Sequence, residues 1–380
     1  MTLGKIVARA AICSEQQSDK DMIFVVGCPR SGTYLLSNIL DGSGQIAIPT
    51  ESHFIPLFNR FVPMFGNLND SRGRIRLLRA IYDFLEIWAR RAEEERDYED
   101  MVQYSLLATR EYSESIIENS RTYPEIVHTM YRNYAALKGV SRYGDKSAFF
   151  QHIPLDKIDR AVAGSAKFIH IVRDGRDVCI SWMKLSMGPE NIAVAARAWR
   201  EHVMGKREWG KAHPDRYCEV RYEDLIVNPE TEIRRICEFV GIEFAPEMLL
   251  SYQGRMAQAI ANSTTHAMLG RSIDSNNREK WRTQMRNNDI SLFEWVAGDV
   301  LTASGYHVSV TIPSRIKNVG LLVRDRFSRL RAVFSYRNLR LLLKGVLPAV
   351  LLVTEYGGIN IKKVVNSKVW LHFERINQTH

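Results

Sequence analysis

The chain has 380 residues, of which 45% are hydrophobic and 25% charged, the proportions of an ordinary globular protein. This composition excludes a disordered, collagen-like or multi-span membrane chain. Five scattered cysteines without a CxxC pair argue against a disulfide framework or zinc ribbon and favour a reducing compartment. The N-terminal apolar stretch is interrupted by Lys5 and Arg9 and is too short for a secretory signal. We therefore expect a cytoplasmic protein.

The net charge of +9 is concentrated at the C-terminus. Residues 315–380 hold 13 Lys and Arg against 3 Asp and Glu, whereas residues 1–314 hold 39 against 40. The neutral body argues against nucleic-acid binding through the body, and the basic tail predicts contact with an acidic surface such as anionic lipid. Its longest charge-free run, Gly345–Thr354, has 10 residues against the ~20 that span a bilayer. The tail is thus either a helix peripheral at the membrane or a segment packed on the body or a second subunit.

Buried strands and helices alternate along the body. Short apolar runs predict strands at Met22–Gly27, Lys167–Val172 and Tyr217–Tyr222. A helical stretch follows each, and residues 72–137 have few helix breakers. The pattern predicts an α/β fold, a mostly parallel sheet with helices on both faces.

One helix has clear end signals. Asn228 stands at its N-cap and Pro229 at its first position, and Gly241 stops it. We divide the chain into a domain over residues 20–310, with a helical insertion at about 70–140, and a basic, partly apolar extension over 311–380.

The segment after the first strand predicts an anion site. Backbone N–H groups at such a strand–helix turn, with the helix dipole behind them, bind phosphate-like groups. Gly27 and Gly32 have the spacing of the nucleoside-triphosphate loop, but Thr33 stands where that loop needs lysine. The cation is instead Arg30, and Tyr34 follows the threonine. We expect a phosphate-binding loop without the usual metal apparatus, and no metal site.

A second anion site follows the second strand. Arg173 leaves the carboxyl end of that strand, and Ser181 lies eight residues further on, in a helix. Ligands of open parallel sheets bind at these ends, and arginine is suited to forked phosphate recognition. Together the two sites predict a ligand with phosphates at two places.

At these residues the chain resembles the sulfotransferases that use 3′-phosphoadenosine-5′-phosphosulfate (PAPS). The resembling segments are FVVGCPRSGTYLLSNIL, FIHIVRDGRDVCIS, VRYEDLIVNPETEIRRICEFVGI and REKWR. They are most similar to the PRSGT branch, which includes tyrosylprotein sulfotransferases and many bacterial enzymes. The resemblance implies a P-loop-like α/β fold, PAPS as the donor, adenosine 3′,5′-bisphosphate as the product, and no metal.

The resemblance also implies roles for residues that bind the donor. The 5′-phosphosulfate would contact the Arg30 side chain and the backbone of Ser31, Gly32, Thr33 and Tyr34. Arg173 and Ser181 would hold the 3′-phosphate. Tyr222 would contact the adenosine, and Lys280, before a tryptophan, would close over the donor.

The catalytic residues are likewise assigned by resemblance. Glu51 matches the catalytic glutamate of the tyrosylprotein branch, and His53 is the rival base because other branches use histidine. Lys146 resembles the lysine that stabilises charge at the bridging oxygen. An assisting hydroxyl would come from residues 263–265, with Ser263 as the choice among three.

We expect a hydroxyl compound as the acceptor, and the basic, partly apolar tail favours a glycan, glycolipid or other small molecule. Protein tyrosine, which the branch suggests, is less favoured because that reaction belongs to a lumenal compartment and no signal segment is recognised. The residues leave open whether the chain forms a homo-oligomer.

Two alternative functions stay open. One is an ATP-using kinase-type phosphotransferase, for which Asp174 is the only candidate carboxylate for Mg²⁺. The other is a catalytically inactive nucleotide-binding or membrane-scaffold protein.

Overall fold

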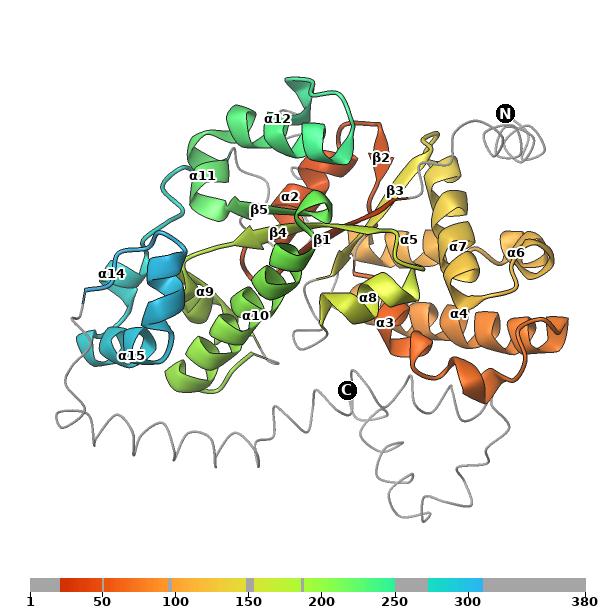
Figure 1. Ribbon diagram of the computed structural model, residues 1–380, viewed down its shortest axis with the longest axis horizontal. Coiled ribbons are helices and arrows are strands. Elements are labelled where there is room, and N and C mark those ends of the chain that lie inside the picture. The colour runs from red at the N-terminus through yellow and green to blue at the C-terminus, as the bar shows by residue number, and fades with distance from the viewer. Residues whose placement is uncertain are drawn as a thin grey trace, which may run out of the picture.

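The computed structural model describes residues 21–49, 51–94, 98–147, 154–185, 188–249 and 273–309 (Figure 1). Within these ranges five strands form one parallel sheet in the order β2-β3-β1-β4-β5. The strands are β1 (Met22–Gly27), β2 (Ile46–Ala47), β3 (Arg142–Ser147), β4 (Ala166–Val172) and β5 (Tyr217–Arg221).

The central strand β1 pairs on both sides. Ile23 lies opposite Gly144 of β3, and Val25 lies opposite Ile169 of β4. Because all the pairs are parallel, the strands end at the same edge of the sheet. The segments that follow β1, β3 and β4 therefore meet at this edge.

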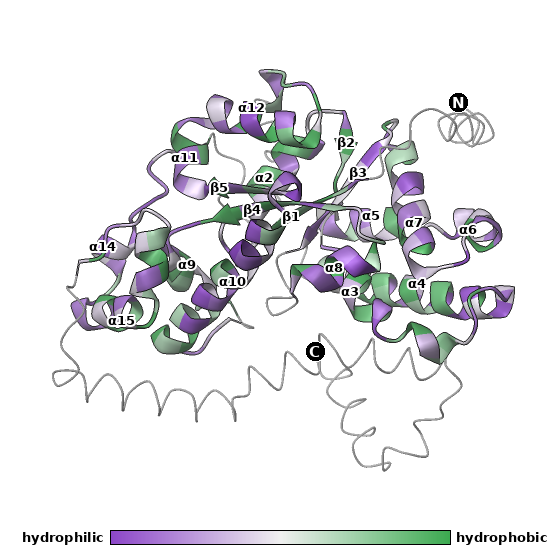
Figure 2. Ribbon diagram, viewed as in Figure 1, coloured by the Kyte–Doolittle hydropathy of each residue, from purple (hydrophilic) through white to green (hydrophobic). Residues whose placement is uncertain are grey.

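Helices cover both faces of the sheet. Helices α2, α11 and α12 share a core with Ile23 and Val25, and α4, α7 and α8 share one with Phe24 and Val26. Figure 1 shows α12 above the sheet and α8 and α10 below it. Figure 2 shows hydrophilic and hydrophobic residues along both α4 and α12, as expected of helices with one buried face. The predicted α/β class with helices on both faces is confirmed.

The α-helices of the described residues are α2 (Thr33–Asp41), α3 (Phe54–Asn59), α4 (Ser71–Glu94), α5 (Tyr98–Leu107), α6 (Ser113–Asn119), α7 (Tyr123–Leu137), α8 (Leu155–Ala161), α9 (Gly175–Trp182), α10 (Ile192–Ala212), α11 (Tyr222–Val227), α12 (Pro229–Val240), α14 (Trp281–Gln284) and α15 (Asn287–Ala303). Short 3₁₀ turns are η1 (Val62–Phe65), η2 (Arg110–Tyr112) and η3 (Pro214–Arg216).

The predicted end signals of α12 are observed. The helix begins at Pro229 after Asn228, and Gly241 ends it with φ +72°. Asn228 makes no side-chain cap hydrogen bond, so the stop signal is the stronger of the two. The third predicted strand ends one residue early because Tyr222 begins α11. The sequence analysis did not identify β2 and β3 as strands.

Gly32 joins the loop after β1 to helix α2 in a conformation that excludes side chains. Its φ is +99°, and a Cβ atom there would lie 2.5 Å from Cδ2 of Tyr222. A side chain would meet both backbone strain and a steric clash. The glycine thus lets the loop approach the start of α11.

We predict that Gly32→Ala lowers the free energy of unfolding by about 2–4 kcal/mol, because strain and overpacking add. Gly205→Ala is the matched control. Gly205 lies within α10, and a Cβ atom there would meet nothing within 4 Å. Alanine at this position should therefore raise the free energy of unfolding by about 0.5–1 kcal/mol. Urea unfolding of both variants measures the contrast, and equal stabilities would contradict the packing assigned to Gly32.

Candidate active site

The loop after β1 has a left-handed backbone at two positions, Arg30 with φ +69° and Gly32. A non-glycine residue in this region costs about 1–3 kcal/mol and persists only where its surroundings hold it. Here the Nε atom of Arg30 donates a hydrogen bond to Oγ of Ser181 in α9, at 2.9 Å. The two predicted anion sites are therefore joined by a direct contact.

Two positive side chains lie close together at this junction. Burial, and then the like charge of Arg173, lower the pKa of Arg30. Nη1 of Arg173 donates to the backbone oxygen of Arg30 at 3.4 Å. Within the described residues, the buried Ser31 Oγ and Arg173 Nε have no hydrogen-bond partner. Buried polar atoms of this kind are uncommon unless a ligand or water satisfies them. The site therefore fits an anionic ligand.

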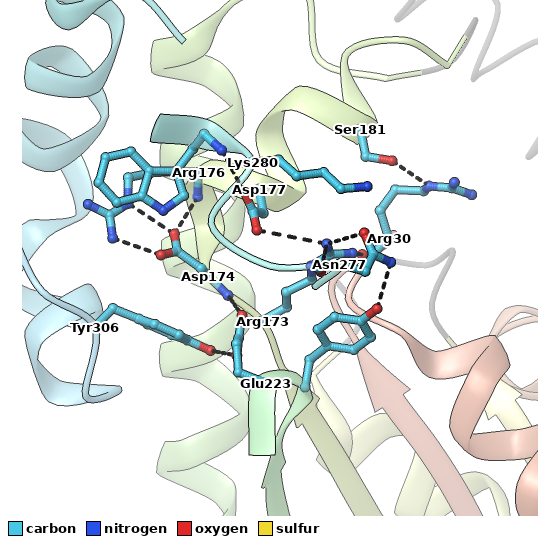
Figure 3. A network of polar contacts seen from close by, with 12 residues as sticks. Arg30, Arg173, Asp174, Arg176, Asp177, Ser181, Glu223, Asn277, Lys280 and Tyr306 are labelled. Atoms are coloured by element: carbon cyan, nitrogen blue, oxygen red, sulfur yellow. Dashed lines mark hydrogen bonds and ion pairs between the residues drawn. The ribbon is translucent and has the colours of Figure 1, made fainter. Parts of the chain in front are cut away.

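Residues from later in the chain contact the Arg173 side chain. Its Nη2 atom donates to the backbone oxygen of Asn277 at 2.9 Å, and its guanidinium lies 4.3 Å from the ring centre of Tyr222. Nδ2 of Asn277 donates to the Tyr222 hydroxyl at 2.8 Å. Figure 3 shows Lys280 in the same region as Arg30 and Ser181. Segments far apart in sequence thus gather around Arg173.

A buried ionic network supports this region (Figure 3). Arg176 forms ion pairs with Asp174 at 2.7 Å and Glu294 at 2.6 Å, and its guanidinium lies 3.6 Å from the ring centre of Trp281. The Trp281 backbone N–H donates to Asp177 at 2.8 Å. Asp174 also accepts from the Arg176 N–H, as the cap of α9. The candidate Mg²⁺ carboxylate therefore has a structural role.

Glu51 and Lys146 form an ion pair, with 3.1 Å between Oε1 and Nζ. Nδ1 of His53 lies 3.8 Å from the other Glu51 oxygen. The ammonium group of Lys146 also lies 5.0 Å from the ring centre of Tyr34. Burial opposes the charge of Lys146, but nearby carboxylates, Glu51 foremost, raise its pKa above the ordinary value. Two of the three predicted catalytic side chains, Glu51 and Lys146, thus meet at one place.

Neighbouring polar groups fix this pair. The Tyr104 hydroxyl donates to the Glu51 backbone oxygen at 2.8 Å. Asp145, beside Lys146 in β3, accepts from the hydroxyl of Tyr131 and, at 2.6 Å, from that of Ser147. Burial raises the pKa of Asp145 to about 6, against the opposing effect of these hydrogen bonds. The polar residues of β3 are therefore buried with partners.

A small pocket lies beside the pair. Its lining combines charged and apolar side chains from the segment before α3, from α3, α8 and α10, and from the ends of β1 and β3, namely Val26, Glu51, Ser52, His53, Pro56, Lys146, Ser147, Leu155, Ile158 and Lys206. Lys206 was not predicted as a site residue, and neither were Asn277 and Tyr104. Of these three, only Asn277 could have been suspected from the sequence, because it lies three residues before Lys280.

Some predictions fall outside the described residues, namely Ser263 with its neighbours and the basic tail over 311–380. In the parts that the structure describes, no group of three or more His, Cys, Asp or Glu is placed to hold a metal ion. No helix in those parts is long and apolar enough to cross a membrane.

Sequence comparisons identify relatives of this chain. The model of the sulfotransferase family matches residues 22–246, more than half of the chain, so the chain belongs to this family. Sulfotransferase 2A2 of Rattus norvegicus is 25% identical over 145 residues, which cover 32% of this chain and 49% of that protein. A Caenorhabditis briggsae protein named "Putative protein-tyrosine sulfotransferase" is 24% identical, covering 73% of this chain and 81% of its own length. The chain spans about half or less of the length of the first curated relatives that it matches.

Solved structures share the fold. The sulfotransferase domain of the Synechococcus PCC 7002 olefin synthase has a TM-score of 0.52 and 21% identity, covering 77% of this chain and 97% of that domain. The sulfotransferase domain of the curacin biosynthetic pathway has a TM-score of 0.51 and 22% identity, covering 76% and 98%. The predicted P-loop-like sulfotransferase fold is therefore confirmed.

We predict that Arg176→Met lowers the free energy of unfolding by about 3–5 kcal/mol, because it removes the positive charge that Asp174 and Glu294 share in the protein interior. Arg200→Met is the control, since Arg200 also contacts α15, through Asp299, but at the surface. That exposed pair should contribute less than about 1 kcal/mol. Denaturant unfolding compares the two, and similar losses would show that the network of Arg176 does not support the fold.

Proposed function

We propose that the chain is a sulfotransferase that moves the sulfonyl group from PAPS to an acceptor hydroxyl. The observation that carries the proposal is the contact between Arg30 and Ser181, which joins the loop after β1 to the helix after β4. A donor with a phosphosulfate at one end and a phosphate at the other needs two such anion sites side by side. The unpartnered Ser31 Oγ and Arg173 Nε support the same conclusion.

The donor would lie along the carboxyl edge of the sheet. Arg30 and the N–H groups of residues 31–34 would hold the 5′-phosphosulfate, where the α2 dipole favours negative charge. Arg173 and Ser181 would bind the 3′-phosphate. Tyr222 and Lys280 would contact the nucleotide from the side of α11 and α14.

In the transfer, the acceptor oxygen attacks sulfur in line with the bond that breaks. Glu51 accepts the hydroxyl proton, and the bridging oxygen leaves with the bisphosphate, carrying the electron pair of the broken S–O bond. Lys146 stabilises the charge that develops on that oxygen. The ion pair of Glu51 with Lys146 supports these roles, because it holds the two side chains together at the proposed position of the reaction. His53 is the rival base, at 3.8 Å from Glu51.

For the acceptor we propose a hydroxyl compound such as a glycan, glycolipid or other small molecule, reached from the helical insertion at about residues 70–140. The extension over 311–380 would bring the enzyme to an anionic membrane surface from the cytoplasm. Protein tyrosine is the less favoured acceptor. The ATP alternative is weakened because Asp174 is committed to Arg176 and Thr33 replaces the loop lysine.

The donor site is tested by thermal unfolding with adenosine 3′,5′-bisphosphate. Saturation at about a hundred times the Kd adds roughly 2.7 kcal/mol, so the Tm should rise by a few degrees. Arg173→Ala should abolish this shift, and Arg200→Ala, at an exposed position, should keep it. A shift only with ATP and Mg²⁺ would favour the kinase alternative, and no shift with either ligand would favour an inactive scaffold.

The base is tested by comparing Glu51→Gln with His53→Asn, since asparagine tolerates the left-handed backbone of residue 53 (φ +60°). We predict that Glu51→Gln lowers kcat by about 10²–10⁴-fold and keeps bisphosphate binding, because general base catalysis is lost. Transfer of ³⁵S from PAPS to glycans, glycolipids and a tyrosine peptide measures turnover. A loss confined to His53→Asn would instead assign the proton to His53.

A further inference from the structure

Lys206 places a second buried ammonium group at the pocket of Glu51 and Lys146. Its residue is only 7% exposed, and it lines that pocket from α10. Its Nζ atom lies 2.9 Å from Nδ1 of His202 and 3.5 Å from the backbone oxygen of the same residue. Lys146 has the Glu51 carboxylate as its partner, whereas Lys206 contacts the imidazole ring and the backbone carbonyl of His202.

The groups that face Lys206 do not neutralise it. Cys28, in the loop after β1, is a buried thiol whose pKa is raised by burial, so it stays neutral. Burial lowers the pKa of His170, in β4, to about 4, so this imidazole is neutral as well. Burial also lowers the pKa of Lys206 to about 8, which still leaves the ammonium group charged at neutral pH.

A carboxylate partner is absent from the described residues around Lys206, where no ion pair forms with it. A buried charge without a counter-charge is destabilising, and an anion that enters the site reduces this cost. The surroundings of Lys206 therefore favour the binding of an anionic ligand.

The position of Lys206 indicates which ligand brings the anion. The pocket walls shared with Lys206 come from α3 and α8, through Pro56, Leu155 and Ile158. The residues assigned to the 3′-phosphate, Arg173 and Ser181, are not part of this lining. An acceptor hydroxyl that reaches Glu51 has to enter the same pocket, so the acceptor is the molecule that meets Lys206.

We propose that Lys206 binds an acidic group of the acceptor, so that the enzyme sulfonates hydroxyl compounds carrying a carboxylate, phosphate or sulfate near the reacting hydroxyl. This inference rests on the proposed sulfotransferase function. The hydroxyl would face Glu51, and the acidic group would face Lys206. Neutral hydroxyl compounds of the same size would leave the buried ammonium unpaired and bind more weakly.

The test uses the full chain saturated with adenosine 3′,5′-bisphosphate, which fills the donor site. Thermal unfolding is followed while sodium sulfate or sodium acetate replaces sodium chloride at constant ionic strength. We expect a saturable rise in Tm with sulfate, acetate or both. Lys206→Met should weaken this anion binding at least tenfold, because a charged hydrogen bond is lost. Lys206→Arg should keep it, as should Lys211→Met, which removes an exposed charge near the end of the same helix.

The affinity for the bisphosphate tells whether Lys206 belongs to the acceptor site or to the donor site. We expect it to be the same in Lys206→Met as in the wild type, and unchanged by sulfate. Weaker bisphosphate binding in Lys206→Met, or competition between sulfate and bisphosphate, would place Lys206 in the donor site and overturn the proposal. An anion effect lost in Lys146→Met but kept in Lys206→Met would also overturn it.

The measurement on the wild-type protein needs no variant. If sulfate and acetate give no saturable rise in its Tm, the proposal is overturned. If Lys206→Met fails to fold, Lys206→Gln removes the charge while keeping a polar side chain. Failure of the proposed function would look different, since the bisphosphate itself would then give no shift in the wild-type protein.

Discussion

The parallel pairing of β1 with both β3 and β4 is the constraint on which the site depends. It places the carboxyl ends of three strands at one edge, so the loop after β1, Lys146 of β3 and Arg173 after β4 become neighbours. A slip of one residue in β3 would turn every side chain of that strand to the opposite face of the sheet. Lys146 would then leave Glu51, and Asp145 would take its place.

Positive side chains lie close together near the carboxyl edge of the sheet, and their repulsion and burial lower the stability of the fold. Arg30 lies near Arg173 although like charges repel, and the buried Lys206 forms no ion pair with a carboxylate in the described part of the chain. Such arrangements are common where a protein retains local conflicts for the sake of function. The ion pairs of Arg176, by contrast, join one guanidinium to two carboxylates. The fold thus combines like charges that lie close together with buried ion pairs of opposite charge.

The sequence predicted the elements that local rules specify. The strand at Met22–Gly27 has a continuous apolar run, and the helix beginning at Pro229 has its own end signals. Strand β3 was missed because RYGDKS is polar, and its burial depends on partners such as Tyr131. The resemblance supplied Glu51 and Lys146 as candidates, but their contact arises from the pairing of β2 with β3. Lys206 could not be foreseen, because only tertiary packing brings α10 to the pocket.

Asn277 and Trp281 attach the segment before α15 to Arg173 and Asp177, across about a hundred residues of sequence. A nucleotide bound beside this wall would meet residues that these contacts hold in place, so binding would cost little ordering entropy. If the nucleotide lay behind the wall, it would leave only when the wall detached. The residence time of the spent donor, and with it the turnover rate, would then depend on how often this segment opens.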